Sequence, residues 1–280
     1  MILLTGASGF IGSALRIKLE SSHFTCATLT SSDTKFNPEF EEIGHKVTCI
    51  VVCGGFVAHS NAEAQDLIGA QKSDQLMAFL FSKEFPNLKK IIYLSTCDVY
   101  SQSGEIDEAS NIEGSNLYTI TKIKQELYVQ RFATDRNITF VILRLGNVFG
   151  PGEFRFNKII PRAIECALSN QALVLSITRQ SKIQPIYIND VTNSIMQLVQ
   201  QCETSMMLNL VGESPITVED LIFEISKYAN LKVVEGRQVS DYTRIYNAKK
   251  MLEIFRIPFT KFPEGIMEEF NFEKKRLNFR

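Results

Sequence analysis

The stretch NLYTITK, residues 116–122, places a phenol and an amine four positions apart, at Tyr118 and Lys122. Residues i and i+4 of a helix lie on the same face. A tyrosine titrates at about pH 10, and an ammonium group one turn away favours its ionised form. A shift of about three pH units, roughly 4 kcal/mol, would let the phenol exchange a proton near neutral pH. The pair alone leaves open a simpler interpretation, a half-buried tyrosine beside a solvated lysine.

A glycine-rich turn, TGASGFIG, carries Gly6, Gly9 and Gly12 directly after an apolar N-terminal run. Between a strand and a helix, this spacing is typical of a loop that binds the pyrophosphate of a dinucleotide. Gly6 allows a tight turn, Gly9 lets the phosphates approach the backbone, and Gly12 lets the helix pack closely, while the helix N-terminus attracts the charge. Phe10 and Ile11 belong to the same predicted cofactor site. A glycine-rich turn without a ligand is the alternative.

The end of the second predicted strand bears on which dinucleotide fits. NAD sites usually place Asp or Glu there, where it binds the ribose 2′-hydroxyl. Here the strand ends with Thr30, Ser31 and Ser32, so that no carboxylate repels a 2′-phosphate, and Lys35 could reach one. The sequence therefore favours NADP(H) over NAD(H). The usual arginine is absent and Asp33 lies close by, which leaves NAD(H) open.

Alternating strands and helices must position these residues. The predicted strands are 1–5, 24–30, 47–52, 90–95 and 138–145, and the predicted helices are 11–20, 62–83, 116–133 and 157–169. This alternation predicts βαβ units and a parallel sheet, and runs such as CIVV suit a sheet covered on both faces. A third strand within 31–46 is weak or absent. We expect an α/β fold with a Rossmann-type doubly wound parallel sheet.

The alternation loosens beyond residue 150. ALVLSI and PIYI predict short strands, and TVEDLIFEISKYA, residues 217–229, predicts an amphipathic helix with a threonine cap. We therefore predict a dinucleotide-binding domain over 1–150 and a smaller, mixed α/β substrate-binding part over 151–280. A segment at about 183–192 is expected to return to the first domain.

Composition excludes several classes of protein. The 280 residues are 45% hydrophobic and 22% charged with a net charge of −1, so we expect neither nucleic acid nor a membrane as partner. The most apolar stretch, 49–58, is too short to cross a bilayer. The N-terminus lacks the cationic start of a signal peptide, which predicts a cytoplasmic protein. The six cysteines are scattered and the three histidines lie far apart in sequence, so we expect neither a disulfide nor a bound metal.

Further motifs follow in a fixed order along nearly the whole chain. They are YLSTCDVY at 93–100, with Thr96 lying 22 residues before Tyr118, LRLGNVFGPG at 143–152, PIYINDV at 185–191 and LNLVGESPITVEDLI at 208–222. Together with the glycine loop, they make the chain resemble the extended short-chain dehydrogenase/reductase family. This family comprises the nucleotide-sugar epimerases, dehydratases and reductases.

The resemblance implies roles for three residues. Tyr118 would be the general acid/base, and Thr96 would hydrogen-bond the same substrate oxygen. Lys122 would bind the nicotinamide ribose and lower the pKa of Tyr118, and hydride would pass between the nicotinamide and a sugar carbon. The simpler interpretations are a strand-end hydroxyl for Thr96 and a solvated helix residue for Lys122.

The residues after Thr96 bear on the type of reaction. Dehydratases of the family follow the threonine with an Asp-Glu pair, whereas this chain has Cys97 and Asp98. The missing first acid disfavours dehydration. Asp98 stands where some relatives keep an acid or base toward the substrate, and a plain strand-end carboxylate is the alternative.

The resemblance also implies a substrate site. Asn147 in GNVFGPG, with Arg237 and Asp241 in GRQVSDY, matches residues that hold the substrate diphosphate and ribose in relatives. Many relatives have an arginine just before PIYINDV, where this chain has Gln184, which puts common UDP-sugars in doubt. Asn116 replaces a usual proline and suggests a divergent member.

These observations predict an NADP(H)-dependent reductase of a nucleotide-linked ketosugar. An NDP-sugar 4-epimerase with tightly held NAD is the alternative, and a non-catalytic dinucleotide-binding regulatory protein is a third possibility from another class. Relatives commonly dimerise through two helices, here about 62–83 and 116–133, so the resemblance also implies a homodimer.

Overall fold

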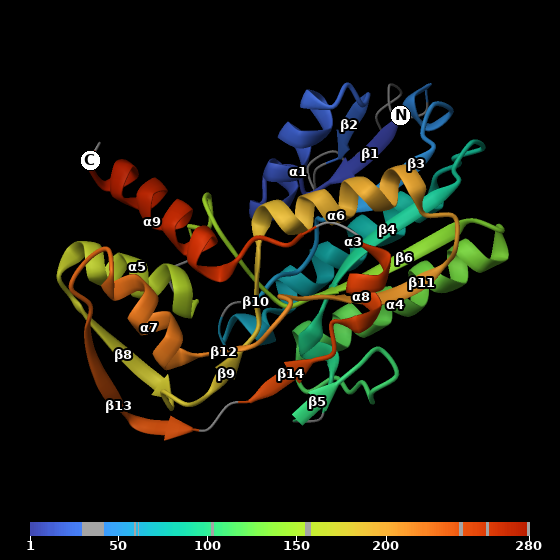
Figure 1. The fold of residues 1–280 in the computed structure, drawn as a ribbon. Coiled ribbons are helices and arrows are strands. Elements are labelled where there is room, and N and C mark those ends of the chain that lie inside the picture. Colours follow the sequence, from blue (N-terminus) through green and yellow to red (C-terminus); the bar gives the residue numbers. More distant parts are fainter. Residues whose placement is uncertain are drawn as a thin grey trace. The chain divides into compact units, whose positions relative to one another are not determined.

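The structure, a computed structural model, describes residues 1–29, 42–58, 60, 62–101, 104–154, 158–240, 243–255 and 258–278. Contacts along the chain gather in two units, each of which is built from several segments (Figure 1). The first unit comprises Met1–Ser101, Glu108–Leu145 and Thr192–Leu208, and the second comprises Gln102–Asp107, Gly146–Val191 and Asn209–Arg280. Domain limits of 1–150 and 151–280 stay predictions.

A six-stranded sheet in the order β11-β6-β4-β3-β1-β2 forms the centre of the first unit. Its strands are β1 (Ile2–Thr5), β2 (Cys26–Leu29), β3 (Cys49–Val52), β4 (Lys90–Thr96), β6 (Thr139–Leu145) and β11 (Met206–Leu210). The pairs β1·β2, β1·β3, β3·β4 and β4·β6 are parallel. This arrangement confirms the Rossmann-type α/β fold. The weak third strand expected within 31–46 lies mostly outside the described residues.

Helices flank this sheet (Figure 1). They are α1 (Phe10–Ser21), α3 (Leu67–Ser82), α4 (Leu117–Asp135) and α6 (Ile188–Gln201). The single helix expected over 62–83 is interrupted, because a 3-10 turn, Glu63–Gln65, precedes α3. Asp66 between them has an extended backbone, and its carboxylate accepts a hydrogen bond from the Ile68 N–H at 3.0 Å, which starts a new helix.

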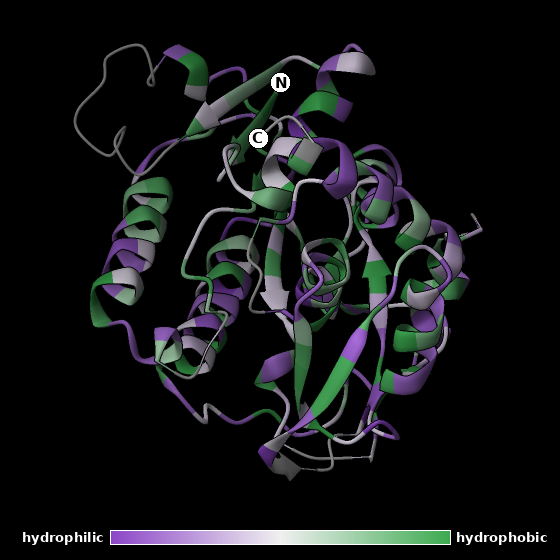
Figure 2. Ribbon diagram, turned by 90° about the vertical axis from the view of Figure 1, so that its left-hand side faces the viewer, coloured by the Kyte–Doolittle hydropathy of each residue, from purple (hydrophilic) through white to green (hydrophobic). Residues whose placement is uncertain are grey.

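Apolar strand residues build the core of the first unit. Leu3, Ile50 and Ile91 are fully buried and lie opposite one another on adjacent strands. They belong to one cluster with Leu80 of α3 and Val129 of α4. Figure 2 shows hydrophobic residues along the strands and mixed residues along the helices. This packing brings the carboxyl ends of β1, β3 and β4 to one edge of the sheet, where ligands bind in such folds.

The second unit consists of short strand pairs and a group of helices. The strands are β5 (Gly104–Ile106), β7 (Asn147–Phe149), β8 (Ala172–Ile177), β9 (Lys182–Ile183), β10 (Pro185–Tyr187), β12 (Ile216–Thr217), β13 (Lys232–Ser240) and β14 (Arg244–Tyr246). The helices are α5 (Ile159–Ser169), α7 (Val218–Ser226), α8 (Lys249–Ile254) and α9 (Phe262–Asn278), of which α5, α7 and α9 contact one another. The predicted threonine cap is present, since Thr217 and Asp220 form a capping box at the start of α7.

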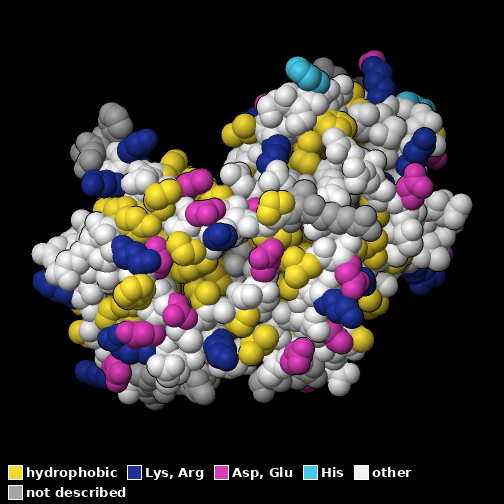
Figure 3. Space-filling view, in the orientation of Figure 1, with side chains coloured by type: hydrophobic (Ala, Val, Ile, Leu, Met, Phe, Trp, Pro, Cys, Tyr) yellow, Lys and Arg dark blue, Asp and Glu magenta, His cyan; other side chains and the backbone are white. Residues whose placement is uncertain are grey.

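The described helices and the charged side chains on one face bear on possible partners. None of the described helices is long and apolar enough to cross a membrane. On the face drawn in Figure 3, Lys and Arg side chains are interspersed with Asp and Glu side chains instead of gathering in one patch.

Candidate functional site

The glycine turn between β1 and α1 depends on the absence of side chains. Gly6 has a φ of +70°, and a Cβ there would lie 2.4 Å from the backbone nitrogen of Gly54. A Cβ on Gly12 would lie 2.0 Å from the Gly6 carbonyl oxygen, so α1 can approach the turn only because Gly12 has no side chain. Gly9 precedes α1, and its N–H donates to the Gly6 carbonyl at 2.9 Å.

The turn fits a dinucleotide phosphate. Gly9 is exposed, and as the N-cap residue of α1 it has no side chain that could cap the backbone N–H groups of the first turn. Such a helix start attracts phosphate. Phe10 and Ile11, predicted with the glycines, are half-buried in the first turn of α1. A dinucleotide would therefore place its pyrophosphate here.

Two further glycines, Gly54 and Gly55, follow the end of β3 and were not predicted as part of the site. The N–H of Gly54 donates to the Thr5 side chain at 3.0 Å, and this contact joins the ends of β1 and β3. Gly55 has a φ of +151°, and a Cβ on it would lie 3.0 Å from the Ser73 hydroxyl and 3.9 Å from the Lys122 amine. The sequence signal for this approach was the GG pair directly after the strand CIVV.

The structure brings Thr96 and Tyr118 together. Thr96 ends β4 and Tyr118 is the second residue of α4, and the two are 7% and 9% exposed. Burial raises the pKa of Tyr118 above its ordinary value and the charge of Asp98 raises it further, whereas a hydrogen bond with the Thr96 side chain lowers it. The ring of Phe56 meets the Tyr118 ring edge-on, with centroids 5.5 Å apart. The expected fall of the Tyr118 pKa through Lys122 is thus not seen, because burial and Asp98 outweigh the hydrogen bond with Thr96, and Tyr118 is held protonated beside a second hydroxyl.

Lys122 lies on the buried face of α4. It is 6% exposed, its amine donates to the Leu94 carbonyl at 3.0 Å, and it lies 5.2 Å from the centroid of the Tyr93 ring. Burial lowers the pKa of Lys122 to about 8, although the charges of Glu126 and Cys53 act in the opposite direction. Because Lys122 also approaches Gly55, the amine lies between the end of β4 and the end of β3. The solvated alternative for Lys122 is wrong.

Cys97 and Asp98 follow Thr96 in a 3-10 turn, Cys97–Val99. The Cys97 thiol is buried and donates to the Arg144 carbonyl at 3.2 Å, so it points into the protein. Asp98 is exposed, and its carboxylate accepts a hydrogen bond from the Thr96 hydroxyl at 3.2 Å. Of the two, Asp98 therefore has the accessible polar group.

Asn116 caps the helix that carries Tyr118. Its side chain accepts a hydrogen bond from the Thr119 N–H at 2.9 Å, and the Thr119 hydroxyl accepts one from the Asn116 N–H at 3.2 Å. This reciprocal capping box fixes the first turn of α4. The Asn116 that replaces a proline is thus the residue that starts the helix.

Apart from Asp98 in the first unit, the predicted substrate residues lie in the second unit or outside the described residues. Asn147 begins β7 and Arg237 lies on β13, and both are exposed. Asp241, Thr30 and Ser31 lie outside the described residues, so the structure gives no geometry for the predicted ribose contacts.

Gln184, at the position of the missing arginine, has a structural role. It is 2% exposed, its amide nitrogen donates to the carbonyls of Gly212 and Tyr246 at 2.7 and 3.0 Å, and its amide oxygen accepts from the Tyr246 N–H at 2.8 Å. The side chain therefore joins three backbone segments of the second unit.

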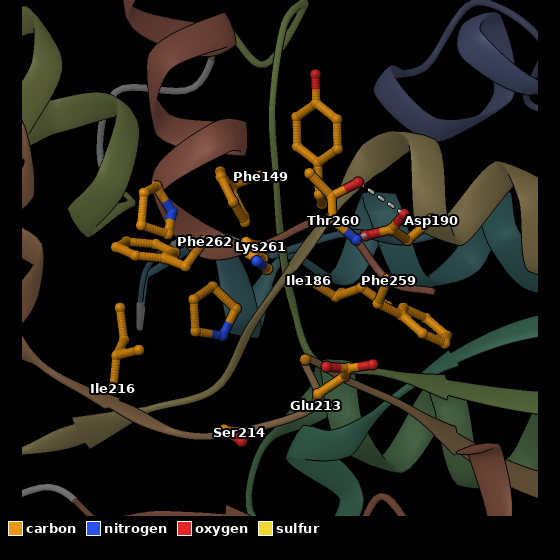
Figure 4. A pocket seen from close by; sticks show the side chains of 14 residues that line it. Phe149, Ile186, Asp190, Glu213, Ser214, Ile216, Phe259, Thr260, Lys261 and Phe262 are labelled. Atoms are coloured by element: carbon orange, nitrogen blue, oxygen red, sulfur yellow. Dashed lines mark hydrogen bonds between the residues drawn. The ribbon is translucent and has the colours of Figure 1, made fainter. Parts of the chain in front are cut away.

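A cavity of 310 Å³ opens in the second unit (Figure 4). The rings of Phe149, Phe259 and Phe262 line it, and Asp190 accepts hydrogen bonds from the Thr260 N–H and hydroxyl, both at 2.9 Å. Its size lies at the lower end of small-molecule sites. Neither Asn147 nor Arg237 belongs to its lining.

Among the described residues, no three His, Cys, Asp or Glu side chains are grouped so that they could hold a metal ion.

The fold and the site together define a class: a parallel α/β protein with a dinucleotide-type glycine turn, and with a threonine, a tyrosine and a lysine buried at the carboxyl ends of its strands. The sequence matches the model of the NAD dependent epimerase/dehydratase family over residues 2–210. The chain belongs to this family, as its motifs indicated.

Individual relatives are distant. The chain is 24% identical over 190 residues to a trifunctional UDP-glucose 4,6-dehydratase/UDP-4-keto-6-deoxy-D-glucose 3,5-epimerase/UDP-4-keto-L-rhamnose-reductase of Arabidopsis thaliana. The aligned region covers 64% of this chain and 28% of that protein. The chain thus spans little more than a quarter of that relative. Its fold is similar to MoeE5 in complex with UDP-glucose and NAD (TM-score 0.82, 18% identity, 99% of each chain). It is equally similar to a Thermotoga maritima UDP-glucose 4-epimerase with UDP-glucose (TM-score 0.82, 17% identity, 99% of each chain).

Proposed function

We propose that the protein reduces the ketone of a nucleotide-linked sugar, with Tyr118 as the general acid. The observation that carries this proposal is the hydroxyl pair of Tyr118 and Thr96 at the carboxyl end of β4, with the Lys122 amine behind it. Family membership supports the nucleotide-sugar substrate and the dinucleotide.

The protonation state of Tyr118 is compatible with reduction. Burial and Asp98 raise its pKa, so the phenol carries its proton at neutral pH and can give it to a carbonyl oxygen. An enzyme that oxidises an alcohol first needs the phenolate, which a positively charged nicotinamide ring favours. Reduction starts from the protonated phenol, which a tyrosine of ordinary pKa also provides at neutral pH, so the raised pKa agrees with reduction without selecting it.

The buried thiol of Cys97 argues against dehydration. Elimination of water needs an acid that reaches the substrate, and family dehydratases have a carboxylate at this position. Here the side chain points to the Arg144 carbonyl. Dehydration would therefore have to proceed without this acid.

The proposed step uses the chain's residues as follows. When bound, reduced nicotinamide supplies a hydride to the carbonyl carbon. Tyr118 donates its proton to the carbonyl oxygen, so that the C=O double bond becomes a C–OH group, and Thr96 holds the same oxygen. Lys122 positions the ribose, and solvent reprotonates Tyr118 afterwards.

The test is oxidation of NADPH and NADH with a panel of NDP-ketosugars, followed by absorbance. We expect Tyr118→Phe to lose about 10²- to 10⁴-fold in kcat while it still binds the dinucleotide. Tyr128→Phe is the matched control, because Tyr128 lies on the same helix but is 45% exposed. Wild-type activity in Tyr118→Phe would contradict the proposal, whereas dinucleotide binding by the wild type without any oxidation across the panel would favour a non-catalytic dinucleotide-binding protein.

An NDP-sugar 4-epimerase is the second candidate, supported by the similarity to a UDP-glucose 4-epimerase over 99% of both chains. Such an enzyme would return its cofactor unchanged. Purified protein that carries stoichiometric NAD⁺ and interconverts UDP-glucose and UDP-galactose without added NADPH would favour it.

The proposal includes a preference for NADP(H), supported by the lack of a carboxylate at Thr30, Ser31 and Ser32. The NAD in the complex of the similar protein MoeE5 supports the opposite choice. Calorimetric titration with NADP⁺ and NAD⁺ decides between them, and tighter binding of NAD⁺ would overturn the preference.

We also propose a homodimer formed through α3 and α4. Both helices expose apolar side chains: Leu67 and Ile68 of α3 are 59% and 64% exposed, and Ile120 and Leu127 of α4 are 50% and 59% exposed. Exposed apolar groups of this kind mark association surfaces. Sedimentation of the wild type and of Leu127→Glu tests this; we expect the wild type to be a dimer and the variant a monomer.

The proposal includes a cytoplasmic location, which is supported by six cysteines that are all free thiols.

A further inference from the structure

Helix α4 buries apolar residues in its C-terminal half, such as Val129 and Phe132, but the middle of its buried face is polar, unlike the apolar stripe of a usual surface helix. Its residues Lys122, Gln125 and Glu126 are at most 6% exposed, whereas Ile120 and Leu127 are at least half exposed. Burying a charge is costly unless partners compensate it. The buried polar face of α4 therefore calls for partners within the protein.

Three successive residues of β4 supply contacts to this face. The Tyr93 hydroxyl donates to Gln125 at 2.8 Å, the Leu94 carbonyl accepts from the Lys122 amine at 3.0 Å, and the Ser95 hydroxyl donates to Glu126 at 2.5 Å. The next residue of β4 is Thr96. The three contacts therefore fix how α4 lies along β4, directly beside the pair of Thr96 and Tyr118.

Glu126 is itself held by Arg144 of β6. The Arg144 guanidinium donates to both carboxylate oxygens, at 3.1 and 2.8 Å, and to the Tyr100 hydroxyl at 3.1 Å. Both members of the pair are about 2% exposed. A bidentate arginine is the geometry that best keeps a buried carboxylate ionised. Glu126 therefore carries a fixed negative charge one helical turn after Lys122.

We propose that Glu126 is a positioning residue, which keeps the Lys122 amine charged and α4 in place against β4, so that Tyr118 meets Thr96. It touches neither substrate nor cofactor and acts through Lys122. The importance of this role for catalysis rests on the proposed function, while the electrostatic link to Lys122 does not.

The groups facing Lys122 come from several elements. Glu126 lies on α4, Cys53 follows β3, and the Tyr93 ring lies on β4. Burial opposes the charge of Lys122, and Glu126 is the largest influence that favours it. Cys53 adds little negative charge, because burial raises the pKa of its thiol to about 12. Arg144 lies behind Glu126 as its partner.

The test reads the charge of Lys122 directly. In protein with carbon-13 at the ε position of lysine, the Lys122 signal is identified by its loss in Lys122→Met, and its titration midpoint is measured by NMR without dinucleotide. We expect the midpoint to fall in Glu126→Gln, which keeps the shape of the side chain and removes its charge. Glu126→Asp, which keeps the charge, should restore most of the wild-type midpoint.

Gln125→Met is the matched control. It removes another buried hydrogen-bonding side chain from the same face of α4 without changing the charge. We expect it to lower the melting temperature and leave the Lys122 midpoint in place. An unchanged midpoint in Glu126→Gln, or an equal fall in Gln125→Met, would overturn the proposal. If Glu126→Gln fails to fold, E126Q/R144M replaces it, because removing both partners leaves no unpaired buried charge.

A second measurement connects the charge to ligand binding. At about pH 8, near the pKa of Lys122, NADP⁺ should bind Glu126→Gln about tenfold more weakly than wild type, and the difference should shrink toward pH 6. A pH-independent loss would indicate a structural effect alone and contradict the charge role. If wild type binds no dinucleotide, the proposed function fails, whereas the NMR titration still tests Glu126.

Discussion

Glu269 of α9 offers a test of burial and charge in the second unit. The side chain is 1% exposed, and no described side chain hydrogen-bonds its carboxylate. Burial raises the pKa of Glu269 to about 8, and the charges of Glu273 and Glu153 act in the same direction, while Lys158 and the Gly150 backbone act against it. Glu269 is therefore protonated in the folded protein at neutral pH.

The raised pKa has a defined sign. Between pH 4.5 and about 8, the folded protein keeps a proton that the unfolded chain releases, so the free energy of unfolding falls as pH rises and levels off above pH 8. The difference of 3.5 units between 4.5 and about 8 corresponds to about 5 kcal/mol. Glu269→Gln cannot ionise and should escape this loss.

We therefore expect Glu269→Gln to gain stability relative to wild type as pH rises, with little difference near pH 4.5 and up to about 5 kcal/mol above pH 8. Urea unfolding at a series of pH values measures this. Glu264→Gln is the control, because Glu264 is exposed on the first turn of the same helix. An advantage of Glu269→Gln that does not change with pH would refute the reasoning.

Three further predictions concern the site and its support. Gly12→Ala should reduce both the melting temperature and NADP⁺ affinity, since its Cβ would lie 2.0 Å from the Gly6 carbonyl; unchanged calorimetric binding would contradict this. Asp98→Asn should move the ultraviolet titration of Tyr118 to lower pH, because Asp98 raises that pKa, and an upward shift would disprove the assigned sign. Gln184→Leu should lower the free energy of unfolding in urea by about 2 to 4 kcal/mol, because it leaves buried backbone groups without their hydrogen-bond partner. A loss under about 1 kcal/mol would argue against the structural role of Gln184.

The sheet and the glycine turn could be predicted because they depend on local patterns. Apolar runs such as CIVV mark buried strands, and Gly6, Gly9 and Gly12 answer steric needs that recur wherever a strand leads into a phosphate-binding helix. The pairing of Thr96 with Tyr118 was implied by the resemblance of the ordered motifs to the family. Their catalytic roles stay predictions.

The rest depends on residues that meet only in three dimensions. Nothing in the local sequence indicates that Gly54 must touch Gly6, because α1, β2 and β3 separate them in the chain. The middle of α4 has no apolar helical period, because its buried residues Lys122, Gln125 and Glu126 find hydrogen-bond partners on β4 and on Arg144 of β6. Gln184 was noted only as a missing arginine, yet its amide bonds segments that lie far apart in sequence. The break between the 3-10 turn and α3 could not be predicted, because an aspartate such as Asp66 also occurs within continuous helices.

The inward orientation of Cys97 constrains how this chain could change its chemistry. Exchanging the cysteine for aspartate would restore the residue type of family dehydratases but would direct the new carboxylate toward the Arg144 carbonyl, in a place with almost no solvent. An acid there would stay uncharged and out of reach of a sugar. A carboxylate at position 97 would therefore supply an acid to a substrate only if the 3-10 turn after β4 were also rearranged.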